Sequence, residues 1–239
     1  MQLSAYAYTN RGGRDHNEDS LRASAEQGIF VLADGLGGHR CGEVASQAAV
    51  DAIFTGMAQA EALEEAGLLD LFRSANEELL RRQAQPGQEE MRTTAVALKL
   101  AGSTAVWAHI GDSRLYRFSN GELVGVTADH SVTYRKFLGG EISYMDVYHD
   151  DDRSRLLRVL GKEPCRPEAG QAAVSPGDAF LLCSDGFWEF VYNEEIQADL
   201  CRARTPEEWA EGMLLRHIRR TPPGSDNFSL ITVFVEACG

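Results

Sequence analysis

The sequence lacks the features that mark several common classes of protein. Its five cysteines are scattered singly, with no CxxC pair and no close spacing, which favours reduced thiols over a disulfide framework or a zinc site. No run of about 18 uncharged apolar residues occurs, and the first residues, MQLSAYAYTNRGG, do not combine a basic start with an apolar stretch. We therefore expect a cytoplasmic chain that does not cross a membrane.

Positive charge is also scarce. The 239 residues include 23 lysines and arginines against 36 aspartates and glutamates, which gives a formal net charge of −13. A field of this sign repels phosphate groups, so it argues against general binding to nucleic acid or to an anionic membrane surface. A ligand that carries phosphate would need positive charge supplied locally.

Familiar phosphate-handling motifs are missing as well. There is no GxxxxGK[ST] loop, no complete GxGxxG and no DxDxT sequence after an apolar run. Nucleotide binding and an aspartyl-phosphate mechanism therefore lack support.

The chain reads as one α+β domain over residues 1–239. No repeat, low-complexity tract or linker divides it. Strand-like runs are predicted at residues 3–9, 29–34, 93–100, 104–110, 114–118, 122–127, 178–184 and 228–236. Helices are predicted at 42–57 and 62–85, and after Thr205-Pro206, where a capping residue precedes a proline. Strands in succession with helices in separate blocks favour antiparallel sheets covered by helices.

Acidic residues recur at the ends of these runs, often beside glycine. The pattern occurs at Asn17-Glu18-Asp19, Asp34-Gly35, Asp112, Asp185-Gly186 and Asp226-Asn227. A single Asp-Gly pair is most often a turn. Strand ends from two sheets can meet at one edge, however, and carboxylates gathered there repel one another unless cations neutralise them. A set without His or Cys favours Mg²⁺ or Mn²⁺ over zinc.

These residue types suit hydrolysis of a phosphoester. Asp34 can bridge two ions, and the glycines around it let the Gly35 carbonyl and a substrate approach closely. Two ions roughly 3.5–4 Å apart can activate a bridging water and clamp a phosphoryl group for in-line attack. Arg14, four residues before Glu18, can bind two phosphate oxygens. An ion pair with an acidic neighbour is the alternative for this arginine.

With these residues in view, the chain resembles the metal-dependent protein serine/threonine phosphatases of the PP2C type, in their compact bacterial form. The resemblance runs in family order from about Gly12 to Val235. It is carried by GGRDHNEDS, VLADGLGGHRCGEVAS, RTTAVAL, HIGDSRLYRF, VTADHSV, LLRVLG, GDAFLLCSDGFWEF and SDNFSLITVFV. It implies a four-layer αββα sandwich, with two central antiparallel sheets flanked by helical layers.

The resemblance also implies a centre of two Mn²⁺ or Mg²⁺ ions at one edge of the sandwich. Asp34, Asp185 and Asp226 would ligate one ion. Glu18, Asp34 and the carbonyl of Gly35 would ligate the other.

Further roles follow from the same resemblance. Asp19 would orient metal-bound water, and Arg14 would bind the phosphate. Asp112 together with Asp185 would hold a third, weaker ion. Residues 131–155 fall where the family has a flap that contributes to substrate choice, and their mixed, charged sequence shows no clear core face.

The chain also departs from the family pattern. Leu36 stands where many eukaryotic relatives have a histidine, a proposed proton donor, so the leaving-group acid is unassigned. Arg92 stands where glycine commonly precedes Thr93-Thr94, and it either reshapes a loop entrance or adds a substrate contact. Four other residues are interpreted as structural or surface histidines: His39, His109, His130 and His149.

The predicted function is hydrolysis of phosphoserine or phosphothreonine in proteins by a water or hydroxide that bridges two Mn or Mg ions. The expected partners are phosphorylated proteins, including a bacterial kinase of the eukaryotic-like type or its targets, and we expect a monomer. One alternative is a catalytically weak pseudophosphatase that binds and regulates phosphoproteins. Such chains typically lose metal ligands, whereas all the expected carboxylates are present here. Hydrolysis of phosphorylated small molecules is a further alternative.

Overall fold

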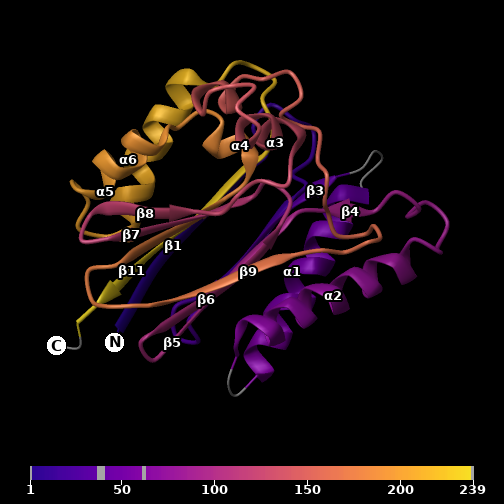
Figure 1. Ribbon diagram of the computed structural model, residues 1–239, viewed down its shortest axis with the longest axis horizontal. Coiled ribbons are helices and arrows are strands. Elements are labelled where there is room, and N and C mark those ends of the chain that lie inside the picture. Colours follow the sequence, from indigo (N-terminus) through magenta and orange to yellow (C-terminus); the bar gives the residue numbers. More distant parts are fainter. Residues whose placement is uncertain (1, 37–40, 61–62, 238–239) are drawn as a thin grey trace.

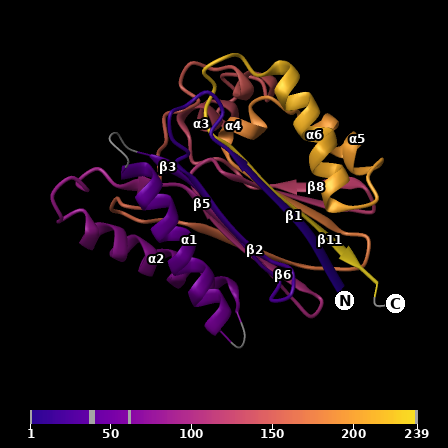
Figure 2. The same cartoon turned by 180° about the vertical axis from the view of Figure 1, so that it is seen from behind.

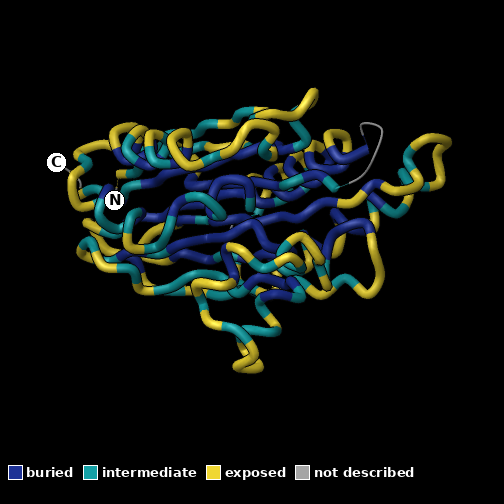
Figure 3. The backbone as a smooth tube through the Cα atoms, turned by 90° about the horizontal axis from the view of Figure 1, so that it is seen from above, coloured by how far each residue is buried: buried dark blue, intermediate teal, exposed yellow. Residues whose placement is uncertain are grey.

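The computed structural model describes residues 2–36, 41–60 and 63–237. Figure 1 shows two stacked sheets with helices on both outer faces, which confirms the predicted αββα sandwich. Figure 3 shows the buried residues as a band between exposed outer surfaces. No helix in the described part of the chain is long and apolar enough to cross a membrane.

Both sheets are antiparallel. The strands of the first sheet are, in spatial order, β1 (Gln2–Asn10), β11 (Phe228–Glu236), β10 (Ala179–Cys183), β7 (Arg114–Ser119) and β8 (Glu122–Val126). Those of the second are β2 (Asp19–Ser24), β3 (Ile29–Leu36), β5 (Ala95–Ala101), β6 (Thr104–Ile110) and β9 (Glu168–Ala173), with β4 (Arg92–Thr93) paired to β3. Because β1 pairs with β11 over its whole length, the two ends of the chain lie side by side (Figure 2).

The helices form the outer layers. They are α1 (Cys41–Gln59), α2 (Glu65–Arg82), α3 (Val132–Leu138), α4 (Asp185–Trp188), α5 (Asn193–Leu200) and α6 (Pro206–Arg220), with a 3₁₀ turn, η1 (Met145–Tyr148). Helices α1 and α2 cover the second sheet, and α5 and α6 cover the first. At the start of α6 the hydroxyl of Thr205 accepts a hydrogen bond from the backbone N–H of Glu208 at 3.1 Å, which confirms the predicted cap.

The alternation of side chains along β3 positions the functional edge. Ile29, Val31 and Ala33 pack towards the helices, whereas Phe30 and Leu32 pack between the sheets. Because side chains alternate along a strand, Asp34 and Leu36 continue the row that faces the other sheet. The apolar row between the sheets thus ends in a carboxylate at the sheet edge.

Several sequence predictions need correction. The strands β2 and β9 and the helices α3, α4 and α5 were not predicted. The expected strand 93–100 is divided at Thr94 into β4 and β5. The expectation that residues 131–155 lack a core face is wrong, because Val147 and Tyr148 are buried against the helical side of the first sheet. His39 lies outside the described residues.

Candidate active site

A cavity of about 740 Å³ opens at the edge where β3, α4 and the start of β11 meet. It is lined by the predicted residues Arg14, Glu18, Asp34, Gly35, Asp112, Asp185 and Asp226. These residues come from segments up to about 200 positions apart, as the resemblance implied. Asp19 is buried directly behind them, hydrogen-bonded to Ser184 and Ser229.

The main chain of Asp34 is held firmly at the end of β3. Its N–H donates to the hydroxyl of Thr94 at 3.0 Å, and its carbonyl accepts from the hydroxyl of Thr93 at 2.7 Å and from the N–H of Thr94 at 2.9 Å. The register of β2 against β3 places Asp19 directly opposite Asp34. The two threonines therefore orient the strand end from which the Asp34 carboxyl group projects.

Gly35 is required by close packing. A Cβ atom at this position would lie 2.2 Å from the carbonyl oxygen of Gly42 and 2.7 Å from that of Glu18. Its N–H also donates to the Glu18 carbonyl at 3.1 Å. The sequence predicted that glycine here lets a substrate approach closely. It also lets α1 and the segment that carries Glu18 pack against the end of β3.

Asn227 joins the chain segments that supply the carboxylates. Its amide oxygen accepts from the N–H of Glu18 at 2.8 Å, and its amide nitrogen donates to the carbonyls of Arg11 and His16 at 2.8 and 2.9 Å. A Cβ on Gly186 would lie 2.0 Å from the Asn227 carbonyl oxygen, so α4 packs directly on this residue. The sequence reasoning treated Asn227 only as a neighbour of Asp226.

Asp19 is a buried carboxyl group with one satisfied oxygen. Its Oδ2 accepts from the hydroxyls of Ser184 at 2.8 Å and Ser229 at 2.7 Å. Its Oδ1 has no hydrogen-bond partner among the described residues. Burial raises the pKa of Asp19 to about 7, against the opposing effect of the two hydroxyls and with added repulsion from Asp185 and Asp226.

The other carboxyl groups are perturbed in the same direction. Burial, then repulsion from Asp185 and Asp19, raises the pKa of Asp34 well above its ordinary value. Burial, then repulsion from Asp185, does the same for Asp112. Burial also raises the pKa of Asp185 and that of Glu18, which is less deeply buried. Collected carboxyl groups of this kind are costly to ionise together without cations.

The donor set fits hard divalent ions. Its side-chain atoms are carboxylate oxygens, which Mg²⁺ and Mn²⁺ prefer. The Oδ1 of Asp185, like that of Asp19, is buried without a hydrogen-bond partner in the described part of the chain. Unpartnered buried oxygens are unusual in proteins, and a cation would satisfy them.

Arg14 lies in the wall of the cavity and meets an acidic neighbour. Its Nη2 is 2.8 Å from the Oδ2 of Asp226, and both side chains are about half exposed, at 56% and 50%. The ion pair considered from the sequence is therefore present. It leaves the guanidinium at the cavity surface, where a phosphate can reach it.

Asp112 is positioned through its main chain. The indole N–H of Trp188 in α4 donates to the Asp112 carbonyl at 2.9 Å. Trp188 in turn lies under the guanidinium of Arg114, 3.4 Å from its ring centre, and Arg114 forms a buried ion pair with Asp129. This buried stack fixes the turn after β6 from which Asp112 reaches the cavity.

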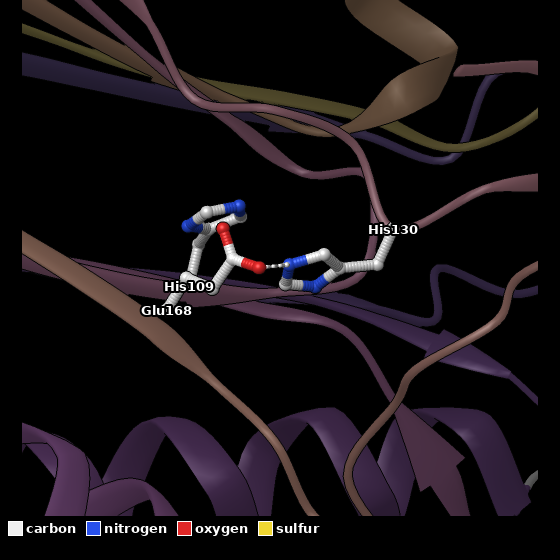
Figure 4. A group of neighbouring side chains, drawn as sticks. All are labelled: His109, His130 and Glu168. Carbon is white, nitrogen blue, oxygen red and sulfur yellow. Dashed lines mark ion pairs between the residues drawn. The ribbon is translucent and has the colours of Figure 1, made fainter. Parts of the chain in front are cut away.

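A cluster of His109, His130 and Glu168 lies beside this turn (Figure 4). The Nδ1 of His130 accepts from the N–H of Gly111 at 3.1 Å, so its Nε2 must carry the proton, which points towards Glu168 at 3.4 Å. A protonated nitrogen has no lone pair for a metal. Arg158 also lies 3.2 Å from that nitrogen and 2.6 Å from Glu168. The cluster is therefore a hydrogen-bonded structural group, in line with the interpretation from the sequence.

Comparison with known proteins identifies the family. The sequence model described as Protein phosphatase 2C matches residues 9–214. The chain belongs to this family. A PP2C relative, the serine/threonine phosphatase stp of Listeria monocytogenes serotype 4b, is 34% identical over 236 residues, which cover 94% of this chain and 93% of the relative.

Solved PP2C structures share the whole fold. The Mycobacterium tuberculosis serine/threonine phosphatase PstP/Ppp matches with a TM-score of 0.89 and 31% identity, over 99% of this chain and 100% of that one. The catalytic domain of PstP in complex with two manganese ions matches with a TM-score of 0.87 and 30% identity, over 99% of each chain. The resemblance to PP2C enzymes and the fold expected from it are thereby confirmed, and the two manganese ions agree with the predicted cofactor.

Proposed function

We propose that this PP2C chain is a metal-dependent protein serine/threonine phosphatase, a hydrolase of phosphoserine and phosphothreonine. The observation that carries the proposal is the meeting of Glu18, Asp34, Asp185 and Asp226 in one cavity with Arg14 in its wall. Oxygen ligands beside a guanidinium suit a phosphoryl group that must be both neutralised and oriented.

Two ions are assigned to this cavity. Asp34, Asp185 and Asp226 would hold one, and Glu18, Asp34 and the Gly35 carbonyl the other. When bound, such a pair supplies Lewis-acid polarisation of the phosphoryl group and a water of lowered pKa. Asp112 with Asp185 would hold a weaker third ion.

The side chains of the protein carry out the remaining tasks. Arg14 binds phosphate oxygens with its planar fork and sets the orientation of the substrate. Asp19, fixed by Ser184 and Ser229, would orient metal-bound water. Leu36 contributes an aliphatic wall, so the leaving-group proton comes from another source.

The partners follow from this activity. We propose that the substrates are phosphorylated proteins, including a serine/threonine kinase or its targets, and that residues 1–239 act as one monomeric domain. Residues 131–155 would serve as a flap that influences substrate choice, since Ser154 lines the cavity and Leu156 follows it there. The cytoplasmic location expected from the sequence stays a prediction.

The test is hydrolysis of a phosphothreonine peptide in Mn²⁺. We expect turnover that is lost on chelation and falls at least about 1000-fold in Asp185→Asn, because one ligand to the assigned ions loses its charge. The matched control is Asp70→Asn, an exposed aspartate of α2, which should keep full activity. Turnover in chelator would contradict the proposal. Peptide binding without turnover in saturating Mn²⁺ would instead support the pseudophosphatase alternative.

A further inference from the structure

Arg92 lies on the face of the sheet that forms the cavity. It is the direct cross-strand partner of Leu36 in the antiparallel pair of β3 and β4, and residues opposite one another in such a pair share a face. Leu36 lines the cavity two residues after Asp34. Thr94, two residues after Arg92, bonds to Asp34 and to Ser113 on the same side. The register therefore places Arg92 beside Leu36, on the face that forms the cavity.

The backbone under Arg92 is held on both sides. Thr93 exchanges hydrogen bonds with Leu160 at 3.2 and 2.8 Å, and its hydroxyl donates to the Asp34 carbonyl. The neighbouring Met91 carbonyl accepts from the side chain of Gln83 at 2.7 Å. A long cationic side chain thus extends from a fixed base, the arrangement that favours a specific contact over a diffuse one.

Within the described part of the chain Arg92 has no ion-pair partner, unlike two other arginines near the site: Arg14 lines the cavity, and Arg153 lines the pocket next to it. Arg14 is paired with Asp226 and Arg153 with Glu189. Arg92 is exposed and forms no ion pair with any other described residue. In a chain of net charge −13, a guanidinium beside cavity-lining Leu36 that pairs with no described carboxylate is available to an incoming anion.

We propose that Arg92 binds an anionic group next to the phosphorylated residue of the substrate. The substrate class is then a protein segment in which the target phosphoserine or phosphothreonine is flanked by a carboxylate or by a second phosphate. This inference rests on the proposed phosphatase function and deepens it. Arg92 acts as a specificity-determining residue, because it contacts the flanking group and not the phosphate that is removed.

The experiment compares kcat/KM for phosphothreonine peptides of one length. The residues before or after the target are glutamine, glutamate or a second phosphothreonine. We expect the unaltered protein in Mn²⁺ to prefer flanking glutamates over glutamines by about three- to fivefold, the range of one exposed ion pair. The preference for a second phosphate should reach about tenfold. Both preferences should fall towards one in Arg92→Gln and reverse in Arg92→Glu. They should also weaken at high salt.

The matched control is Arg202→Gln, an exposed arginine after α5, whose neighbour Ala203 lines a separate pocket with Val235 and Glu236. It should keep both preferences. A preference that survives in Arg92→Gln, or none in the unaltered protein, would overturn the inference. The aryl phosphate p-nitrophenyl phosphate, which has no flanking group, distinguishes failure of the Arg92 inference from failure of the proposed phosphatase function. If it is not hydrolysed in Mn²⁺, the proposed function itself has failed.

Discussion

His130 and Gly111 are joined by two hydrogen bonds. The N–H of Gly111 donates to Nδ1 of His130 at 3.1 Å, and the N–H of His130 donates to the Gly111 carbonyl at 2.9 Å. The His130 carbonyl also accepts from the N–H of Leu157 at 2.7 Å. One residue therefore connects the turn that carries Asp112 with the chain that returns from the flap.

This connection predicts a pH dependence of stability. Burial, then the electrostatic effects of His109 and Arg158, lowers the pKa of His130 from its ordinary value of 6.5 to about 4, against the opposing effect of Glu168. Between these values the unfolded state binds a proton that the folded state does not, so stability is full above about pH 6.5 and is lost as the pH falls. His130 should account for about 2 kcal/mol of the decrease in the free energy of unfolding between pH 7 and pH 5.

Urea unfolding of His130→Asn at pH 7 and pH 5 measures this contribution. The asparagine oxygen can still accept from Gly111 but does not titrate, so the decrease should be smaller than in the unaltered protein. His149→Asn, at an exposed position, should leave the decrease unchanged. Equal decreases in all three proteins would show that His130 does not carry the effect.

Substitution of Arg14 should weaken phosphate binding. Arg14→Ala removes charge-assisted hydrogen bonds to the phosphate, and we expect kcat/KM for a phosphothreonine peptide to fall about 10- to 100-fold. Arg14→Lys should fall less, because it keeps the charge but not the planar fork. Inhibition by inorganic phosphate provides an independent readout and should weaken in parallel. Unchanged inhibition in Arg14→Ala would place the phosphate elsewhere.

Asp19→Asn should make the metal-free protein more stable and should reduce the further stabilisation that Mn²⁺ gives. The amide keeps an oxygen for Ser184 and Ser229 but removes a buried charge that Asp185 and Asp226 repel. We expect a gain of about 1–3 kcal/mol at pH 8 in chelator, a rise of several degrees in Tm. The additional rise that Mn²⁺ gives to the unaltered protein should shrink in the variant. A lower Tm in chelator would contradict the assigned repulsion.

The resistance of the flap, residues 131–155, to local unfolding should depend on the burial of Tyr148. Its ring is 3% exposed and lies edge-on to Tyr192 and Trp188, with centroids 4.9 and 5.9 Å away, and its hydroxyl donates to Asn193 at 3.0 Å. Tyr148→Ala should lower stability by about 3–4 kcal/mol and speed proteolytic cleavage within residues 131–155. Tyr148→Phe loses only the hydrogen bond and should cost about 1 kcal/mol. Equal cleavage rates in the two variants would show that the ring does not hold the flap.

The gathering of acidic residues in one cavity was easier to predict from the sequence than the elements around it. Aspartates at the ends of apolar runs are a local pattern, and the alternation along β3 carries Asp34 to the sheet edge. Strand β9 was missed because EAGQAA has little intrinsic β preference and is stabilised by its pairing with β6. Val147 and Tyr148 were missed because a single 3₁₀ turn is too short to show a period. Asn227 bonds to Arg11, His16 and Glu18, over 200 residues away, and no local signal could indicate that.

The pairing of β1 with β11 has a consequence for how such a domain can be attached to others. Gln2 and Glu236 are partners at one end of the ladder, whereas Asn10 and Phe228, at the other end, lead into Arg14 and Asp226. A strand of nine residues spans roughly 25–30 Å. A sensor or anchor fused at either extremity would stand that far from the cavity and leave its mouth clear. A short tether between the two extremities would likewise permit a circular permutant that retains the catalytic edge.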